Sequence, residues 1–232
     1  MFAQPALFEQ AFLCPHAPRL PMSSTPRDLF DALAEDYETM RTELDWSPFE
    51  HVRTAFESFP LMGKHVLDVG CGTGEITRHL QQQGAIPFGL DISPEMCMTA
   101  AERSENIPYL PHDLNTPLPF EDGRFDAIVA LGCLEYLPDP ASVLAEFARV
   151  LQKDGLFLGV FERCGTDCPG GEAREVTFLD DWCRYRLPED EIHLLLQKYF
   201  RTCRFDRVHG FILEDTGEHT QYVRVIAHGV RH

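Results

Sequence analysis

Three glycines follow a short apolar run that ends in an aspartate, within the segment "VLDVGCGTGEITRHL" (residues 66–80). Gly70, Gly72 and Gly74 alternate with other residues, and a helical pattern begins directly after them. Glycine allows left-handed backbone conformations and lets a ligand approach the backbone closely. The segment therefore predicts a strand-to-helix turn that holds a small molecule, with a purely structural tight turn as the alternative.

Glu75, the residue after the third glycine, restricts the kind of ligand. A dinucleotide-binding turn reads G-x-G-x-x-G and would need glycine at position 75. A carboxylate in the first turn of the helix would repel a pyrophosphate at that helix N-terminus. No Gly-Lys-Ser/Thr follows, which excludes a P-loop. The turn thus favours a ligand with a positive or zwitterionic end and disfavours a pyridine-nucleotide oxidoreductase.

Two further acids stand at the ends of predicted strands. Asp91, in "FGLDIS", can accept hydrogen bonds from both hydroxyls of a ribose, and Asp113, in "PYLPHDLN", can accept one from the exocyclic amine of adenine. Ligands of open α/β sheets bind at this carboxyl edge of the strands. Adenine, ribose and an amino-acid zwitterion together describe S-adenosylmethionine. The alternatives are a structural strand-end acid for Asp91 and a turn aspartate for Asp113.

The elements that would position these residues form an alternating pattern from Lys64 onward. Apolar strands alternate with capped helices, which indicates a parallel sheet with crossover helices. The predicted strands are 65–69, 87–91, 108–112, 125–131, 156–161, 201–211 and 221–227. The predicted helices start at 25–26, 47–48, 73, 93–94, 139–140 and 189, and Gly84 and Gly155 end two of them.

These blocks resemble, in order and spacing, the class I S-adenosylmethionine-dependent methyltransferases over about residues 30–163. "LDVGCGTG" resembles the first motif of that family, and "FDAIVALGCLEYLPDP" resembles its fourth-strand motif. "FDALAEDYE" (residues 30–38) is similar to the F-D-x-x-A-x-x-Y-D lead-in of quinone-biosynthesis-type methyltransferases. The blocks also resemble methyltransferase domains associated with tetratricopeptide repeats, although the sequence contains no such repeat.

The resemblance implies a fold and a cofactor. The fold is α/β: a Rossmann-like, seven-stranded, mostly parallel sheet of order 3-2-1-4-5-7-6 with helices on both faces and an N-terminal helical extension. The cofactor is S-adenosyl-L-methionine, with Phe30 and Tyr37 covering it. The cofactor-binding residues implied are Tyr37, Asp68, Gly70, Cys71, Gly72, Gly74, Asp91, Ile92, Met96, Asp113, Leu114 and Leu131.

In this family the methyl acceptor lies over the tips of the fourth and fifth strands. The candidate substrate residues are Cys133, Glu135, Tyr136, Glu162, Arg163, Arg184 and Tyr185. Arg184 and Tyr185 belong to "DDWCRYRLP", a candidate lid. For each of these residues, the alternative interpretation is a polar side chain exposed to solvent or a side chain packed against a helix. Tyr136 stands where relatives often carry histidine, so no catalytic base is assigned.

The function predicted is in-line transfer of a methyl group to a small-molecule acceptor. The sulfonium is already a good leaving group, so the protein contributes mainly positioning and a dry pocket. A binding module that senses S-adenosylmethionine or docks to a partner without catalysis is one alternative, and a protein methyltransferase is another. No N/D-P-P-Y motif or Pro-Cys dipeptide points to a nucleic-acid base as acceptor.

The composition of the chain restricts the kinds of partner expected for it and indicates where in the cell it is expected. The chain has 37 acidic and 20 basic residues, a net charge of −17, which argues against nucleic acids and anionic membranes. No apolar run approaches the roughly 20 residues that span a bilayer. The spacing of the eight cysteines suggests no disulfide framework, so a cytoplasmic location is expected. Cys164 and Cys168 lack a second compact ligand pair, so no metal site is predicted.

The chain is predicted to form one domain after a flexible tail, residues 1–22, that lacks the features of a secretory signal. Residues 23–232 form the methyltransferase domain. Within it, 23–62 are N-terminal helices, 63–162 the cofactor-binding core, 163–188 a loop or lid, and 189–232 the last helix and the last two strands.

Overall fold

The computed structural model describes residues 25–39, 48–164, 175–178, 182–212 and 219–231. The predicted tail, residues 1–22, lies outside the described residues. So do 165–174 and 179–181, which make up much of the predicted lid.

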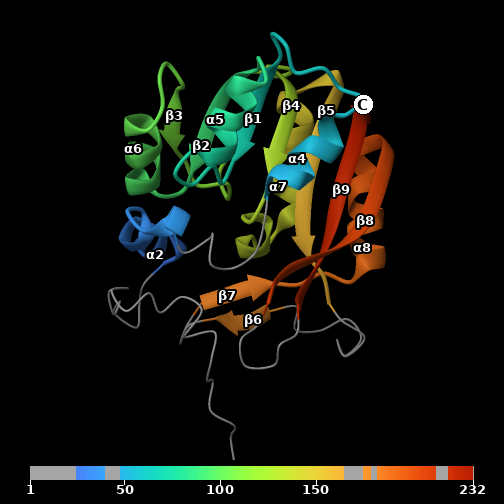
Figure 1. Cartoon of the computed structure of the whole chain (residues 1–232). Coiled ribbons are helices and arrows are strands. Elements are labelled where there is room, and N and C mark those ends of the chain that lie inside the picture. The colour runs from blue at the N-terminus through green and yellow to red at the C-terminus, as the bar shows by residue number, and fades with distance from the viewer. Residues whose placement is uncertain (1–24, 40–47, 165–174, 179–181, 213–218, 232) are drawn as a thin grey trace, which may run out of the picture.

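A seven-stranded sheet forms the centre of the molecule, in the order β3-β2-β1-β4-β5-β9-β8 (Figure 1). Its last strand in sequence, β9, runs antiparallel to both neighbours, while β1 to β5 pair in parallel. The predicted order is therefore confirmed. The strands are β1 (His65–Val69), β2 (Ile86–Asp91), β3 (Tyr109–Pro111), β4 (Phe125–Ala130), β5 (Leu151–Glu162), β8 (Phe200–Ile212) and β9 (His219–Val230).

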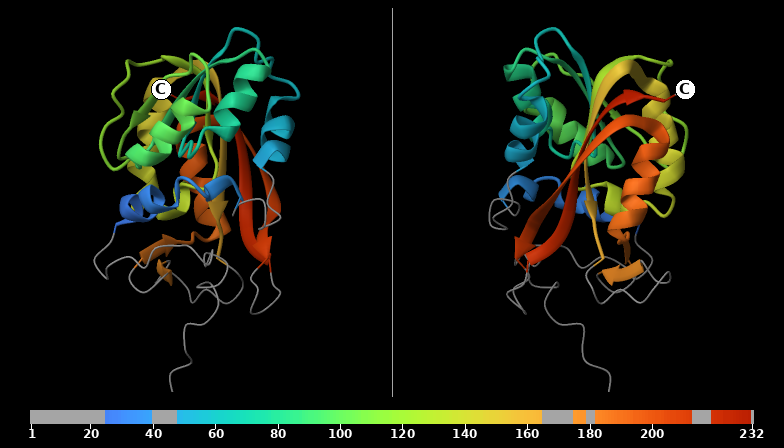
Figure 2. Two further views of the ribbon diagram at one scale, coloured as in Figure 1. Left: turned by 60° about the vertical axis from the view of Figure 1, so that its left-hand side comes forward. Right: turned by 90° about the vertical axis from the view of Figure 1, so that its right-hand side faces the viewer.

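Helices cover both faces of this sheet, as predicted (Figure 2). The helices are α2 (Pro26–Leu33), α4 (Pro48–Phe56), α5 (Glu75–Gln82), α6 (Pro94–Glu102), α7 (Pro140–Val150) and α8 (Glu189–Tyr199), with a 3-10 turn η1 (Leu134–Tyr136). Side chains alternate along a strand, so β4 serves two cores. Ile128 packs with α7 and α8, whereas Ala127 and Val129 pack with α4 and α5.

Two regions differ from the sequence-based expectation, the junction between α7 and β5 and the segment that holds β6 and β7. The helix that Gly155 was expected to end stops at Val150, and β5 begins at Leu151, which pairs with Phe125. The pairing then shifts register before Ala127 meets Leu156, and this irregularity absorbs the extra residues. Within the predicted lid, β6 (Glu175–Phe178) and β7 (Trp182–Tyr185) form an antiparallel pair that the sequence pattern did not indicate.

The cysteines also depart from expectation at one position. Cys164 is disulfide-bonded, whereas the cysteine spacing predicted no disulfide framework. Cys71, Cys97, Cys133 and Cys203 are free. Across the described ranges, no cluster of three His, Cys, Asp or Glu side chains is arranged to hold a metal ion. None of the helices in those ranges has the length and apolar character needed to cross a membrane.

Candidate functional site

The glycine turn lies between β1 and α5 and needs its glycines for two reasons. Gly70, Gly72 and Gly74 have φ angles of 66°, 52° and 80°, in the left-handed region that other residues rarely adopt. A Cβ atom on Gly70 would come within 2.5 Å of Cys133 Cβ, and one on Gly74 within 2.6 Å of Tyr109 Oη. The turn is therefore closely packed by its neighbours as well as tightly bent.

Asp91 holds this turn against the end of β2. The Gly72 N–H donates to Asp91 Oδ2 at 2.8 Å, and the Ser93 N–H donates to Oδ1 at 2.9 Å. Asp91 is buried, and burial raises the pKa of its carboxyl although the backbone donors oppose that shift. Each carboxylate oxygen has a second lone pair. Asp91 can therefore accept hydrogen bonds from a ligand without releasing the turn.

Asp68 occupies a different position, inside the protein behind the turn. The Thr77 hydroxyl of α5 donates to Asp68 Oδ2 at 2.6 Å. Burial, with a further contribution from the nearby charge of Asp91, raises the pKa of Asp68 to about 7 despite the Thr77 hydrogen bond. This side chain fixes α5 to β1 and does not line the cavity described next.

A cavity of about 280 Å³ opens at the carboxyl ends of β1, β2 and β4. It brings together eight of the predicted cofactor residues: Tyr37, Gly70, Gly72, Asp91, Ile92, Met96, Asp113 and Leu114. Asp68, Cys71, Gly74 and Leu131 are not among its lining residues, and Leu131 packs instead against the core beneath α4 and α5. The lining contains no lysine or arginine within the described chain, which suits a ligand without phosphates.

Asp113 and Asn115 form the far end of this cavity. Asp113 Oδ1 accepts from both the backbone and the side-chain amide of Asn115, at 2.9 and 2.8 Å. The Asp113 Oδ2 atom accepts no hydrogen bond from the part of the chain that the structure describes, so it is open to a ligand amine.

Seven lining residues were missed by the sequence analysis: Thr25, Pro26, Leu90, His112, Asn115, Gly132 and Leu137. His112 and Asn115 flank the predicted pair Asp113–Leu114, and Gly132 precedes Cys133. Adjacency to a strand-end motif was the signal available for these three. Thr25 and Pro26 carried only a helix-start signal, which gives no information about a distant cavity.

Helix α2 and three aromatic rings wall the cavity on the side away from the sheet. Phe30 makes edge-on contacts with Tyr37 and Tyr136, with ring centroids 6.4 and 5.5 Å apart. Tyr37 also lies over Gly72, since a Cβ there would be 3.5 Å from the ring. Of the predicted substrate residues, Cys133 and Tyr136 line this cavity. We call Phe30, Tyr37 and Tyr136 the aromatic wall.

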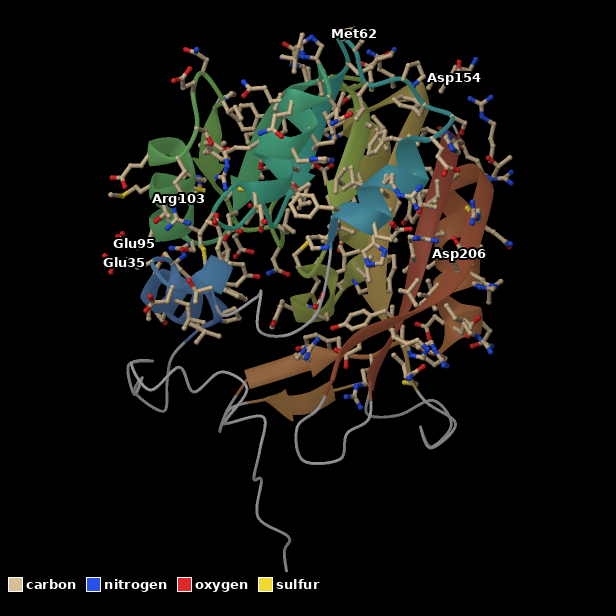
Figure 3. The ribbon with its side chains drawn as sticks, viewed as in Figure 1. Glu35, Met62, Glu95, Arg103, Asp154 and Asp206 are labelled. Atoms are coloured by element: carbon tan, nitrogen blue, oxygen red, sulfur yellow. The ribbon has the colours of Figure 1, made fainter. Side chains whose placement is uncertain are left out.

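The position of α2 is set by its capping residues and by α6. Thr25 and Asp28 form a reciprocal capping box at its start, where the sequence predicted that a helix begins. Asp31 then accepts hydrogen bonds from the Ser93 hydroxyl and the Glu95 N–H. Figure 3 shows Arg103, which directly follows α6, near Glu35, which follows α2, and the Arg103 side chain donates to the Glu35 carbonyl.

Glu38 connects the α2 segment (residues 25–39) to the glycine turn. Its Oε1 accepts from the Thr73 hydroxyl at 2.7 Å and pairs with Arg78 and Arg103, each at 3.0 Å. Burial alone would raise the pKa of Glu38, but these three donors outweigh it and lower the pKa. The lead-in segment is thus tied electrostatically to the elements that form the cavity.

Three other predicted substrate residues gather behind η1 rather than in the cavity. Arg184 Nη2 lies 2.7 Å from Glu162 Oε2 and 3.4 Å from Glu135 Oε1, and all three side chains are nearly fully buried. Arg184 also donates to the Tyr222 hydroxyl and lies over the Tyr136 ring. We call Glu135, Glu162 and Arg184 the buried ion cluster; it supports η1 and Tyr136 from behind.

The last two predicted substrate residues lie elsewhere. Arg163 donates to the Gln221 side chain at 2.9 Å, on the β9 side of the sheet. Tyr185 lines a smaller, separate cavity next to η1. Neither side chain is among those that line the 280 Å³ cavity.

Comparison with known proteins agrees with this geometry. Residues 67–159 match the methyltransferase domain family. The chain is 36% identical over 132 residues to demethylmenaquinone methyltransferase of Tropheryma whipplei, covering 56% of this chain and 55% of that protein. It is 36% identical over 112 residues to a ubiquinone biosynthesis O-methyltransferase of Coxiella burnetii, covering 46% and 47%. The chain thus spans about half the length of these curated relatives.

Solved structures share the fold at low sequence identity. A Burkholderia thailandensis 1,6-didemethyltoxoflavin-N1-methyltransferase, solved with S-adenosylhomocysteine, has a TM-score of 0.64 at 21% identity, covering 88% of this chain and 87% of that one. A Methanosarcina mazei S-adenosylmethionine-dependent methyltransferase has a TM-score of 0.59 at 21% identity, covering 82% and 100%. The family match over residues 67–159, the strand order and the glycine turn held by Asp91 agree, and in this region the chain is similar to class I, S-adenosylmethionine-dependent methyltransferases.

Proposed function

We propose that this protein transfers a methyl group from S-adenosylmethionine to a small-molecule acceptor. The observation that carries the proposal is the position of Asp91. Its carboxylate holds the glycine turn and also lines the cavity that runs from that turn to Asp113 and Leu114. Asp91 would therefore bind the ribose of the ligand and also hold in place the backbone that would bind the amino-acid end.

The lining residues suit the parts of that cofactor. Asp91 would accept the ribose hydroxyls, and Asp113 with Leu114, Ile92 and Met96 would hold the adenine. Backbone groups of Gly70 and Gly72 would bind the methionine end. When bound, the sulfonium supplies an activated methyl group. Phe30, Tyr37 and Tyr136 enclose the neighbouring space and exclude water from it.

The acceptor we propose is an apolar, ring-containing molecule. Beside the glycine turn, the aromatic wall is extended by Leu137, and Cys133 lies at its base. The curated relatives named above are quinone-biosynthesis methyltransferases, which supports a quinol-type ring. Burial raises the pKa of both Tyr136 and Cys133 well above their ordinary values. Both side chains keep their protons near neutral pH, so neither acts as a general base there.

Calorimetric titration of the purified chain with S-adenosylmethionine, S-adenosylhomocysteine and NAD tests the cofactor. We expect micromolar binding of the two adenosyl ligands and a loss of at least ~100-fold in Asp91→Ala. Glu121→Ala, which removes an exposed carboxylate, is the matched control and should bind normally. Ligand at ~100 times its Kd should add roughly 2.7 kcal/mol of stability. Binding of NAD alone, or of none of the three, would contradict the proposal.

Turnover separates catalysis from sensing. A demethylated naphthoquinol, kept reduced, is the first acceptor to assay, followed by smaller catechols and phenols. Methylated product together with S-adenosylhomocysteine supports the proposal. Tight cofactor binding without methyl transfer to any member of the panel would favour a binding module instead.

A further inference from the structure

A second cavity, of about 200 Å³, lies on the other side of the 3-10 turn η1 from the 280 Å³ cavity, which we now call the cofactor cavity. Leu137 lines both cavities, so they are neighbours separated by that turn. The lining combines the apolar side chains of Leu134, Leu137, Phe161, Leu187 and Leu195 with Tyr185 and four carboxylates, Glu135, Asp139, Glu162 and Glu191. The proposed methyl transfer does not take place there.

Glu135 supplies the observation that points to a ligand. Its side chain is 4% exposed, and Oε1 pairs with Arg184 at a long 3.4 Å. The Oε2 atom is fully buried and has no hydrogen-bond partner in the part of the chain that the structure describes. A buried carboxylate oxygen without a donor is unfavourable. Glu135 lines this cavity and not the cofactor cavity, so a donor placed here reaches the buried Oε2 once the Glu135 side chain turns toward the cavity.

The charges around the cavity favour a cation. The positive charges of Arg184 and Arg186 offset the negative charges of Glu162 and Glu135. Glu162 pairs with both arginines, at 2.7 and 2.8 Å, and Glu135 pairs with Arg184. Asp139 adds one more carboxylate to the lining, and no lysine or arginine of the described chain pairs with it. No lysine or arginine is among the lining residues within the described ranges. A positively charged donor would therefore meet an excess of negative charge.

The starts of α7 and α8 lie at this cavity, and helix N-termini ordinarily attract anions. Here acids already occupy both ends. Asp139 accepts hydrogen bonds from the N–H groups of Ala141 and Ser142 at the start of α7. The first turn of α8 carries Glu189, Asp190 and Glu191. The two helix ends therefore do not reverse the preference for a cation.

We propose that this cavity binds a small organic ammonium ion with an apolar ring, whose N–H groups donate to Glu135. The apolar lining suits the ring, and Glu135 with its neighbouring carboxylates suits the charge. A cavity of roughly 150 Å³ is enough for benzene, so this one has room for a ring with a one-carbon ammonium arm. The site goes beyond the proposed methyl transfer and does not depend on it. Because η1 also carries Tyr136 into the cofactor cavity, an occupant here lies on the other side of η1 from the aromatic wall.

Titration of the full chain with benzylammonium, followed by NMR, tests the site. Benzyl alcohol is the neutral probe of the same shape, and benzoate is the anionic one. We expect saturable binding of benzylammonium, at least ~10-fold weaker binding of benzyl alcohol, and none of benzoate. Glu135→Gln should weaken benzylammonium at least ~10-fold and leave benzyl alcohol unchanged. Glu121→Gln, at an exposed position, should change neither.

A second variant keeps the test independent of the ion cluster, since Glu135→Gln also changes a partner of Arg184. Leu195→Trp fills the cavity from α8 and should abolish binding of both neutral and cationic probes. Equal binding of the cation and the alcohol, or undiminished cation binding in Glu135→Gln, would overturn the proposal. No binding at all would also overturn it, and would leave water as the partner of Glu135. Titration of the same samples with S-adenosylhomocysteine reads the cofactor cavity separately.

Discussion

Gly74 and Gly123 have similar backbone angles but different surroundings. Substituting each one therefore separates the cost of backbone strain from the cost of steric overlap. Their φ angles are +80° and +64°. A Cβ on Gly74 would lie 2.6 Å from Tyr109 Oη and 2.9 Å from Ala100 Cβ, whereas the nearest atom to one on Gly123 is 4.0 Å away. We expect Gly123→Ala to lose about 1 kcal/mol of unfolding free energy from backbone strain alone. Gly74→Ala should lose roughly 2–4 kcal/mol, because overlap adds to strain.

Urea unfolding of both variants measures this difference. Equal losses would mean that Tyr109 moves aside and that only backbone strain matters at Gly74. Binding of S-adenosylhomocysteine should weaken in Gly74→Ala, because a displaced turn would move Gly70 and Gly72, which line the cofactor cavity, and should stay unchanged in Gly123→Ala, which lies outside that turn.

Asp68 should make the stability of the protein depend on pH. Its folded-state pKa, about 7, lies above the ordinary value of 3.8, chiefly because the carboxyl is buried. The folded state therefore holds the proton more tightly than the unfolded chain. The stabilisation is fully present below pH 4 and is lost as the pH rises toward 7. Asp68→Asn removes this dependence and should gain stability relative to the wild type at pH 8, by up to about 4 kcal/mol.

The comparison to make is the difference in unfolding free energy between Asp68→Asn and the wild type, at pH 5 and at pH 8. Other carboxyl groups, including Asp91, titrate in both proteins and largely cancel. A difference that is the same at both pH values would show that Asp68 is not protonated in the folded state. The amide oxygen introduced by the substitution can still accept from Thr77, so α5 should keep its position.

Among the elements, the α2 segment should depend on Glu38 for its attachment to the cofactor cavity. Glu38 accepts from Thr73 and pairs with Arg78 and Arg103. Glu38→Gln keeps the size of the side chain but removes its charge. We expect faster amide hydrogen exchange in residues 25–39 and a ~3- to 10-fold loss of S-adenosylhomocysteine affinity, because Tyr37 and Phe30 are held less firmly. The melting temperature should change little, since the pairs are partly exposed.

Glu102→Gln on α6 is the matched control, because Glu102 is exposed and lies outside this network. If Glu38→Gln leaves hydrogen exchange in the α2 segment unchanged, then Asp31 and the aromatic contacts alone hold that segment in place.

Local signals explain which elements the sequence could predict. The start of α2 follows from Thr25 and Asp28, and that of α6 from Ser93, since each cap forms within three residues. The glycine turn and Asp91 could be predicted because each stands at the end of a short apolar strand. Arg184 shows the limit: its partners Glu135 and Tyr222 are 49 and 38 residues away. Nothing in "DDWCRYRLP" identifies those partners, so the substrate-facing interpretation and the buried ion cluster could not be told apart.

At the scale of the whole molecule, the strand order was predictable because the family resemblance implied it. The preference for right-handed βαβ connections agrees with that order in β1 to β5 but does not select it. The boundary of β5 was not predictable, because "LQKDG" carries a helix-ending glycine and no strand pattern. Its extended conformation depends on the partner residue Phe125, on a strand distant in sequence. The set of residues that line the cofactor cavity likewise depends on α2. The position of α2 relative to the sheet is set by contacts between residues far apart in the sequence.

The net charge of −17 leads to a prediction for the molecule as a whole. Like charges in excess destabilise the compact state, and salt screens them, because the Debye length falls from about 30 Å at 0.01 M to about 10 Å at 0.1 M. Salt also weakens exposed ion pairs, which acts in the opposite direction. Pairs such as Arg53–Glu50 are more than half exposed, and pairs of that kind contribute little. Relief of repulsion should therefore dominate.

We expect the melting temperature to rise by several degrees between 10 and 150 mM NaCl, with KCl and choline chloride giving the same shift. The same excess charge should prevent binding to a 20-base-pair DNA duplex at 150 mM NaCl, because phosphate contacts require clustered lysine and arginine. A melting temperature that falls with salt would instead give the controlling role to ion pairs such as Lys64–Asp126, which is less exposed and 2.8 Å long. Retention on the duplex would reveal a local basic surface that the net charge conceals, and it would reopen nucleic acid as an acceptor for the methyl group.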